Sequence, residues 1–517
     1  MLWLPATLIA LAMVAPLAYL VIRGAGASEE TWSLLFRART AEILWRSVVL
    51  MATVTTVSMA LGVSLAWLTV RSDIPLRRFW SVVSVLPLVV PSYVGALVVV
   101  SALGPTGLLR DILDGPFGVQ RLPEIYGLSG TTLTLALLNY PLVLLIVKGA
   151  LNGLDPALED SARSLGVRPA VAVLRVTLPQ LKPAIASGSL LVALYTLSDF
   201  GAVSLLGYET FTWAIYQQYQ TSFDRSVASS LSLVLVAVAA TVLVLEARSR
   251  GRARYYRTGP GAARPPTVVP LGRWRWPAVA LCAAVGLAAV AGPVAVLGYW
   301  VGQGIAVGER EMLLWGELWN SVLISGAAAL VTTACSVPIA ALAVRYPSPI
   351  SQLVERLSFT GYALPGVVVA LSLVFVGVNV VRPVYQTGWM LLFAYVVLFL
   401  PMALGATRSA MMQASPGLEE AARGLGRTPL QTLLTVTVPQ MRSGMLVGVA
   451  LVFLVAIKEL PATLILGPLG FQTLATAVWS ASSEAFYARA AAPALMLVLV
   501  SSIPIAALVW RGERLQV

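Results

Sequence analysis

The chain has 517 residues, of which 58% are hydrophobic and 11% are charged. Because soluble domains usually carry about 25% charged residues, this composition excludes an ordinary soluble protein and indicates a polytopic membrane protein. A formal net charge of +12 is also found in nucleic-acid-binding proteins, but here the charges lie between apolar segments. That placement is typical of basic cytoplasmic loops, so we expect no nucleic-acid partner.

Twelve apolar segments approach or exceed the roughly 20 residues that a helix needs to cross a bilayer. Backbone groups cannot stay unpaired in lipid, and the segments do not alternate apolar with polar residues. The sequence therefore predicts an all-α polytopic membrane protein. The segments are 3–22, 43–70, 80–103, 131–147, 184–206 and 227–245 in the first half, and 276–300, 321–344, 357–378, 390–407, 445–466 and 490–510 in the second.

The first segment, 3–22, has an alternative interpretation as a cleaved signal peptide. Ala25-Gly26-Ala27 follows it and resembles a cleavage site. However, no basic residue precedes the apolar run, and the matching segment 276–300 is internal. We therefore expect 3–22 to be retained as a membrane span.

The two halves of the sequence match in order. Pro91 corresponds to Pro365, 274 residues later, and Pro141 corresponds to Pro401, 260 residues later. The loop 104–130 of the first half must therefore carry 14 extra residues. Such internal duplication predicts a tandem repeat.

The repeat predicts two six-helix domains, 1–245 and 276–517, joined by an Arg-, Gly- and Pro-rich linker, 246–275. Because six is an even number, both domains cross the membrane in the same direction, as in a parallel repeat. Placing both termini in the cytoplasm puts most Lys and Arg residues in inward loops. We expect a multi-pass protein of the bacterial cytoplasmic (inner) membrane.

The sequence offers little for catalysis. It holds no histidine, and its two cysteines, Cys282 and Cys335, lie in separate apolar stretches. A membrane-embedded enzyme would lack a catalytic cluster, so we expect no catalytic residue, no metal-binding residue and no cofactor on this chain.

A polar motif occurs twice, as Leu-Glu-Asp-Ser-Ala-Arg-Ser-Leu-Gly at 158–166 and Leu-Glu-Glu-Ala-Ala-Arg-Gly-Leu-Gly at 418–426. Asp155-Pro156 and Ser415-Pro416 precede the copies, and Asp or Ser is favoured as an N-cap with Pro in the first helical position. The glycine that ends each copy suits a helix C-terminus. Each copy therefore predicts a short capped helix between two spans.

Two pairs of prolines follow the motifs. Pro169 and Pro429 can each open another short helix. We expect Pro179 and Pro439 to interrupt that helix just before the next span. The complete motif regions are thus 155–180 and 415–440.

We expect each motif helix to expose a small, charged face. Small residues let a partner approach closely, and charges set its register. An ordinary amphipathic loop helix is the alternative, but two copies with matching caps, glycines and prolines favour a partner site. The expected faces are Glu159, Ser161, Ala162 and Arg163 in one copy, and Glu419, Ala421, Ala422 and Arg423 in the other.

The motif, with Ala three residues after Glu and Gly seven residues after it, resembles the cytoplasmic "EAA" motif of ATP-binding-cassette importer permeases. The first copy departs mildly, with Ser161 where the second has Ala421. The resemblance covers essentially the whole chain as two fused permease halves. It implies that each motif helix docks in a groove on an ATPase subunit and transmits its closure. The matching residues are Glu159, Ala162, Gly166, Glu419, Ala422 and Gly426.

The chain itself cannot supply a standard ATP site. A phosphate-binding loop needs Gly-Lys-Ser/Thr, and none of Lys148, Lys182 and Lys458 follows a glycine. We expect ATP and Mg on two copies of a partner ATPase, one for each motif. The resemblance also implies an extracytoplasmic solute-binding protein, with membrane lipid around the spans.

Three charged residues fall within expected spans: Asp199, Lys458 and Glu459, with the two carboxylates 260 residues apart. Such residues usually face a cavity or a partner, which makes them candidates for the translocation path, with Lys458 pairing or gating. The alternative is structural, as a salt bridge that packs helices or a carboxylate near the outer interface. An ion-gradient-driven secondary transporter would use the same carboxylates as ion sites, although it would not need the paired motifs.

The segments 198–219 and 458–479 are similar to stretches in permeases of ferric-iron importers. Thiamine, polyamine and aminophosphonate permeases share the fused or paired layout, so the resemblance leaves them as alternative cargo classes. Carboxylate oxygens suit a hard trivalent cation, but two carboxylates do not make a ferric site. We therefore expect a low-affinity passage rather than a binding site for iron.

Overall fold

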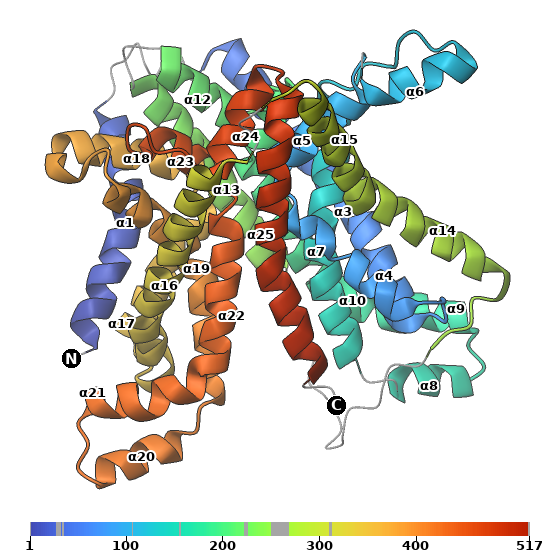
Figure 1. Cartoon of the computed structure of the whole chain (residues 1–517). Helices are drawn as coiled ribbons and strands as arrows, with labels where there is room; N and C mark the ends of the chain where they lie inside the picture. The colour runs from blue at the N-terminus through green and yellow to red at the C-terminus, as the bar shows by residue number, and fades with distance from the viewer. Residues whose placement is uncertain are drawn as a thin grey trace. The chain divides into compact units, whose positions relative to one another are not determined.

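The computed structural model describes residues 2–26, 33, 36–105, 107–154, 157–221, 226–249, 268–309 and 313–514. Within these ranges the regular elements are helices, and the only strand-like pairing is an isolated bridge between Ser72 and Val269 (Figure 1). Among the described residues, eleven helices are long and apolar enough to cross a membrane, or up to twelve if one bent pair counts as a single span. The predicted all-α polytopic class is confirmed.

The residues form two compact units, each of which combines segments from both halves of the sequence. The predicted domains 1–245 and 276–517 group the chain differently and stay predictions. Most of the predicted linker, residues 250–267, lies outside the described residues. Unit 1 comprises Met1–Thr40, Thr212–Val236 and Gln303–Val517, and unit 2 comprises Ala41–Phe211 and Ala237–Gly302.

Unit 2 is built mainly from the helices of the first half, and helix α13 (Ser226–Ser249) begins in unit 1 and ends in unit 2. The other elements of unit 2 are most of α3 (Ala38–Arg71), α4 (Arg77–Val83), η1 (Leu86–Val89), α5 (Ser92–Leu103), α6 (Leu108–Phe117), α7 (Leu128–Gly153), α8 (Ala157–Ser164), α9 (Pro169–Ala172), η2 (Val173–Thr177), α10 (Leu178–Ser198), α11 (Gly201–Leu205), η3 (Gly272–Trp274), α14 (Arg275–Gly286), η4 (Leu287–Ala291) and most of α15 (Gly292–Ala306).

Unit 1 repeats this order with the helices of the second half. Its elements are α1 (Trp3–Ala25), α12 (Phe211–Thr221), α16 (Trp315–Arg345), α17 (Pro349–Ser358), η5 (Thr360–Ala363), α18 (Gly366–Asn379), η6 (Arg382–Val384), α19 (Gly388–Gln413), α20 (Pro416–Gly424), α21 (Pro429–Thr432), η7 (Leu433–Thr437), α22 (Val438–Ala456), α23 (Pro461–Leu466), α24 (Leu474–Ser483) and α25 (Tyr487–Arg514).

The repeat is visible element by element. The five-residue π-helical segments η2 and η7 begin 260 residues apart, and α7 and α19 carry Pro141 and Pro401 in their interiors. The additional residues of the first half include the amphipathic helix α6, which has no counterpart between α18 and α19. The duplication predicted from the sequence thus matches the order of the described helices.

The first helix of each half packs against helices of the other half. In unit 1, α1 contacts α16, α17 and α18, and the ring of Tyr19 stacks on that of Phe375 with centroids 5.9 Å apart. In unit 2, α14 contacts α4, and a Cβ added to Gly286 would lie 2.9 Å from Val83 Cγ1. A glycine is therefore needed for this close helix approach.

Two of the twelve expected spans, 80–103 and 357–378, are not single straight helices. The first is divided into α4, η1 and α5, and the second into α17, η5 and α18, with a bend of 107°. Pro91 and Pro365 occupy the N-cap positions of α5 and α18 in extended conformation. Proline cannot donate a helical hydrogen bond and restricts the residue before it, so the helix restarts there.

Two further expectations about helix ends were wrong. Pro179 and Pro439 do not interrupt a helix: each follows a π-helical segment, and the helix continues into α10 or α22. A wider π turn leaves room for the proline ring where an α turn would clash. The spans expected at 184–206 and 445–466 instead end at Ser198 and Ala456, before the short helices α11 and α23.

Candidate functional site

The motif helices α8 and α20 end as predicted at left-handed glycines, with φ of 84° at Gly166 and 87° at Gly426. Gly166 N–H donates to Arg163 O (3.0 Å), and Val167 N–H donates to Ala162 O (3.1 Å). The second copy has the same two bonds, at 2.9 and 3.1 Å. This pair of bonds defines a Schellman motif, which satisfies carbonyls that a helix end leaves open.

The predicted N-caps have a mixed outcome. Asp155 and Pro156 lie outside the described residues. Ser415 occupies the N-cap position of α20 with Pro416 in the first turn, but its side chain makes no capping hydrogen bond. Instead the Ser415 N–H donates to Gln440 Oε1 (3.3 Å) on α22. Side-chain capping by serine was therefore wrong, although the helix starts where the sequence indicated.

The two motif glutamates are buried, which corrects the prediction that they belong to the exposed face. Glu159 and Glu419 are 5% and 6% exposed. Each pairs with an arginine at the C-terminal end of a long helix, Glu159 with Arg71 on α3 and Glu419 with Arg345 on α16. The physical reason is that a charge leaves water only when a partner compensates it, and these arginines do so.

The second ion pair shows the detailed geometry. Arg345 Nε donates to both carboxylate oxygens of Glu419, at 3.1 and 3.2 Å, and Arg345 Nη2 lies 3.0 Å from Oε1. Nη2 also donates to Ala414 O (2.8 Å), the residue that follows α19. One guanidinium thus joins the ends of α16 and α19 to the motif helix. Such bidentate contacts fix orientation as well as distance.

The first ion pair has a third member. Arg71 donates to Glu159, and Thr177 Oγ1 donates to the same carboxylate at 3.1 Å. Thr177 closes η2, the π-helical segment that leads into α10. Glu159 therefore links α8 to the end of α3 and to the π-helical segment that leads into α10. Arg71 and Arg345 were not predicted as site residues, although their 274-residue separation, equal to that of Pro91 and Pro365, was available in the sequence.

The faces that remain exposed are partly apolar. Leu165 is 84% exposed and Leu425 is 86% exposed, at matching places just before the two glycines. Arg163 and Ala421 are also exposed, whereas Ala422 is buried and Ala162 is partly buried. In Figure 1, α20 and α21 extend beyond the ends of the long helices of unit 1. Each motif thus exposes a leucine and an arginine, while its buried glutamate pairs with an arginine of a long helix.

The carboxylates expected within the membrane lie at helix breaks. Asp199 Oδ1 accepts hydrogen bonds from the backbone N–H groups of Ala202 (3.0 Å) and Val203 (3.4 Å) at the start of α11. Glu459 Oε1 accepts from Ala462 N–H (3.2 Å) at the start of α23. Both therefore satisfy helix N-termini, which is a structural use of the charge. Lys458 lies two residues after the end of α22, and its N–H donates to Val455 O (3.2 Å).

The two copies differ where a neighbouring helix meets the carboxylate. Ser92 begins α5 in the first copy, and the matching residue in the second copy is Gly366. A Cβ added to Gly366 would lie 2.5 Å from Glu459 Oε1. The longer glutamate thus occupies space that a side chain at residue 366 would need. The first copy therefore combines the shorter carboxylate, Asp199, with a serine, Ser92. The second copy combines the longer carboxylate, Glu459, with a glycine, Gly366, so the extra length of the acid is compensated by the missing side chain.

A metal site is not evident. Among the described residues, no group of three or more His, Cys, Asp and Glu side chains could hold a metal ion. Asp199 and Glu459 each lie before the start of a short helix and accept hydrogen bonds from its backbone. A structural role of this kind differs from coordination of a ferric ion.

Comparison with known proteins adds a family. Residues 58–248 and 336–515 match the family model of the binding-protein-dependent transport system inner membrane component. The chain is 36% identical over 503 residues to Fe(3+)-transport system permease protein FbpB 2 of Haemophilus influenzae, covering 96% of each chain. It is 24% identical over 462 residues to ferric transport system permease protein FbpB of Actinobacillus pleuropneumoniae, covering 85% of this chain and 66% of that one.

A shorter relative matches part of the chain. Molybdenum transport system permease protein ModB of Escherichia coli is 32% identical over 197 residues, which is 36% of this chain and 85% of that protein. The similarity thus extends to permeases that are named for a different cargo.

Proposed function

Since the chain belongs to the family of binding-protein-dependent transport system inner membrane components, we propose that it is the permease subunit of an ATP-driven importer for ferric iron. The observation that carries the cargo is the 36% identity to a Fe(3+)-transport permease over 96% of both chains. A match over the whole length includes both repeats, whereas the molybdenum permease covers 36% of this chain. Thiamine, polyamine and aminophosphonate stay as alternative cargo classes.

In this proposal, α8 and α20 each dock on one copy of a separate ATPase subunit that binds ATP and Mg. Their exposed leucines, Leu165 and Leu425, supply apolar contact, while the neighbouring arginines supply charge. ATP hydrolysis then takes place on the partner chains, and this chain is a transport subunit rather than an enzyme. Both termini and both motif helices lie on the cytoplasmic side, and a solute-binding protein docks on the opposite side.

The buried ion pairs give the mechanical connection. A force applied to α20 reaches α16 and α19 through Arg345, which contacts Glu419 and Ala414. A force applied to α8 reaches α3 through Arg71 and η2 through Thr177. Bidentate and buried contacts resist rotation better than a single exposed contact. We infer that Glu159 and Glu419 position the motif helices, while the exposed residues on those helices contact the ATPase.

Asp199, Lys458 and Glu459 are assigned to the neighbourhood of the translocation path. The two carboxylates satisfy the helix breaks after α10 and α22, so most of their hydrogen-bonding capacity is directed to the protein. Iron would therefore pass without a strong site on this chain, which suits release.

The test is uptake of radioactive ferric iron by a deletion strain that expresses this chain with its ATPase and binding protein. We expect uptake that stops when the ATPase is inactivated and that persists when a protonophore collapses the proton gradient while ATP is maintained. Thiamine, putrescine, an aminophosphonate and molybdate serve as alternative cargoes. ATP-dependent uptake of one of these, without iron uptake, would reassign the cargo. Uptake driven by the gradient without ATP would refute the importer mechanism and favour a secondary transporter.

A further inference from the structure

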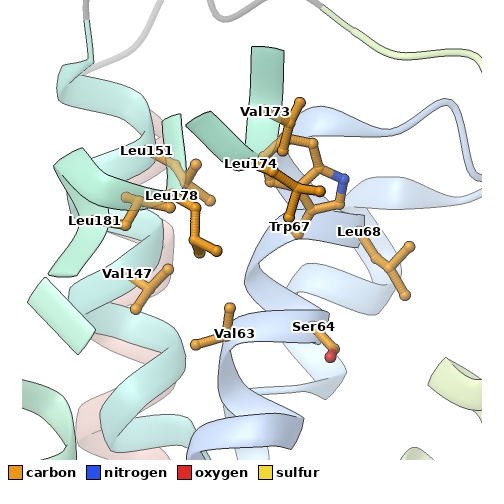
Figure 2. A pocket seen from close by; sticks show the side chains of 10 residues that line it. All are labelled: Val63, Ser64, Trp67, Leu68, Val147, Leu151, Val173, Leu174, Leu178 and Leu181. Carbon is orange, nitrogen blue, oxygen red and sulfur yellow. The ribbon is translucent and has the colours of Figure 1, made fainter. Parts of the chain in front are cut away.

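Unit 2 has an apolar groove of about 360 Å³ between three of its long helices (Figure 2). Its wall comes from α3, α7 and the continuous η2–α10 helix, and Ser64 is the one polar side chain among the ten that line it. In Figure 2, Leu174 is drawn beside Trp67 of α3, and Leu178 is drawn on the other side of the groove. All three helices are candidate membrane spans.

The groove is open rather than enclosed. Leu174 is 62% exposed and Leu178 is 37% exposed. An apolar wall offers water no hydrogen-bond partners, so water is a poor occupant. Within a bilayer the natural occupant of such a space is hydrocarbon.

The matching place in unit 1 is filled by the chain itself. Trp67, Leu151 and Leu181 of the groove correspond to Ala341, Met411 and Met441, which are buried together. Leu2, from the segment before α1, packs against this cluster. The second copy therefore closes with its own side chains a space that the first copy leaves open.

In the described part of unit 2, the residue that corresponds to Leu2 does not fill the groove. When Pro5-Ala6 is aligned with Pro277-Ala278, the counterpart of Leu2 is Trp274. Trp274 is 62% exposed and does not line the groove. Among the described residues, none fills this groove as Leu2 fills the matching place in unit 1.

Two exposed basic residues are neighbours in sequence of residues that line the groove. Arg175 and Lys182 are exposed and lie seven residues apart, each directly after a lining leucine, Leu174 or Leu181. The stretch 169–198 contains no Asp or Glu. Basic side chains at a membrane interface attract anionic headgroups, with about 1 kcal/mol for each Lys or Arg near the surface. The matching residues in the second copy are Thr435 and Arg442, so it has one positive charge fewer.

We propose that this groove is a binding site for one acyl chain of an anionic phospholipid, whose headgroup lies at Arg175 and Lys182. The acyl chain covers Leu174, Leu178 and Trp67, as Leu2 covers the matching cluster in unit 1. The site lies next to the anchored motif helix, because the Arg71 guanidinium stacks over the Trp67 ring at 5.5 Å and pairs with Glu159. The bound lipid thus supports the end of α3 that holds α8.

The test uses the full-length chain in vesicles with a trace of photoactivatable lipid, carrying a diazirine on the acyl chain and either a phosphatidylglycerol or a phosphatidylcholine headgroup. Labelled peptides are identified by mass spectrometry. We expect phosphatidylglycerol to label the peptides that contain residues 63–68 and 173–181 several-fold more than phosphatidylcholine does. Labelling of these peptides should exceed labelling of the lipid-facing positions of the other spans.

Two variants separate the parts of the site. Leu174→Trp fills the groove at an exposed position and should reduce labelling several-fold for both lipids. Arg175→Ala with Lys182→Ala should abolish the preference for phosphatidylglycerol and leave the phosphatidylcholine signal unchanged. The matched control is Leu434→Trp, at the equivalent and 57% exposed position of unit 1, which should leave labelling of unit 2 unchanged.

Equal labelling by the two lipids in the unmodified chain would overturn the headgroup assignment. Unchanged labelling in Leu174→Trp would overturn the groove assignment. The remaining candidate occupant, Trp274, is tested by Leu178→Cys with Trp274→Cys in a background that lacks Cys282 and Cys335. Efficient disulfide formation in lipid vesicles would show that the chain closes its own groove and would also overturn the proposal.

Discussion

Replacement of Arg345 by alanine should release α20 from the end of α16. The change removes the Nε and Nη2 contacts to Glu419 and the bond to Ala414 O. Removing one member of a buried pair costs about 3–5 kcal/mol, because the other charge stays without its partner. The side chains of Arg345 and Glu419 are 16% and 8% exposed, so water can partly solvate the remaining carboxylate. We therefore expect about 3 kcal/mol, or roughly a 100-fold loss in the ratio of docked to undocked α20.

Hydrogen–deuterium exchange of the peptide that contains Pro416–Gly424 measures this ratio directly, because undocking exposes the backbone amides of a short helix. In the Arg345→Ala variant these amides should exchange up to about 100-fold faster, while α8 in the other copy should exchange as before. The size of the change thus reports on one anchor only, and the unmodified copy serves as an internal control.

The variant Arg345→Met with Glu419→Met tests the cause. Replacing both charges by apolar groups of similar length is often close to neutral, so exchange should return most of the way to that of the unmodified protein. Arg345→Lys keeps the charge but cannot make the bidentate contact, so it should fall between the two. Unchanged exchange in Arg345→Ala would refute the anchor. Exchange in the double variant as fast as in the single variant would show that an unpaired buried charge is not the reason for release.

Three further predictions concern the glycines, the carboxylates and the exposed leucines. Gly426→Ala places a Cβ on a residue with φ of 87° and should cost about 1 kcal/mol, seen as faster amide exchange in the last turn of α20, whereas Gly417→Ala on the same helix should have little effect. Gly366→Ser alone should lower the thermal unfolding temperature, because the new Cβ meets Glu459 Oε1 at 2.5 Å. Adding Glu459→Asp reproduces the combination of Ser92 with Asp199 and should restore the unfolding temperature, and a double variant without recovery would contradict the compensation. Leu425→Asp should leave the unfolding temperature unchanged and reduce copurification of the ATPase. Leu469→Asp, at a residue that is also 86% exposed, should not reduce copurification. Equal copurification in both variants would remove α20 from the docking surface.

Local signals in the sequence predicted local structure well. The left-handed conformations of Gly166 and Gly426 follow from a glycine after a short polar helix, and the breaks at Pro91 and Pro365 follow from proline chemistry. The breaks within 80–103 and 357–378 were nevertheless not predicted, because each long apolar run indicates a single span despite the proline within it. The π-helical accommodation of Pro179 and Pro439 has no simple sequence signal.

Long-range contacts explain what could not be predicted. Glu159 appears in the sequence as part of a polar, exposed helix, and its burial depends on Arg71, which lies 88 residues earlier. Glu419 likewise depends on Arg345, 74 residues earlier. Spacing along a helix indicates which side chains share a face but not which other helix covers that face. For Asp199 and Glu459, the sequence left a structural and a transport role open. The hydrogen bonds show that each carboxylate accepts from the start of α11 or α23, and the transport role stays a prediction.

The packing of α1 on helices of the second half has a consequence for biosynthesis. The ribosome makes Trp3–Ala25 about 290 residues before it begins α16, with which α1 will eventually pack. During translation α1 must therefore wait in the bilayer without its final neighbours, while the rest of the first half is inserted. Its length and apolar character allow it to span the membrane alone in that interval. Unit 1 can thus be completed only when the nascent chain is nearly finished. Until then, the newly made first half is most open to quality-control proteases.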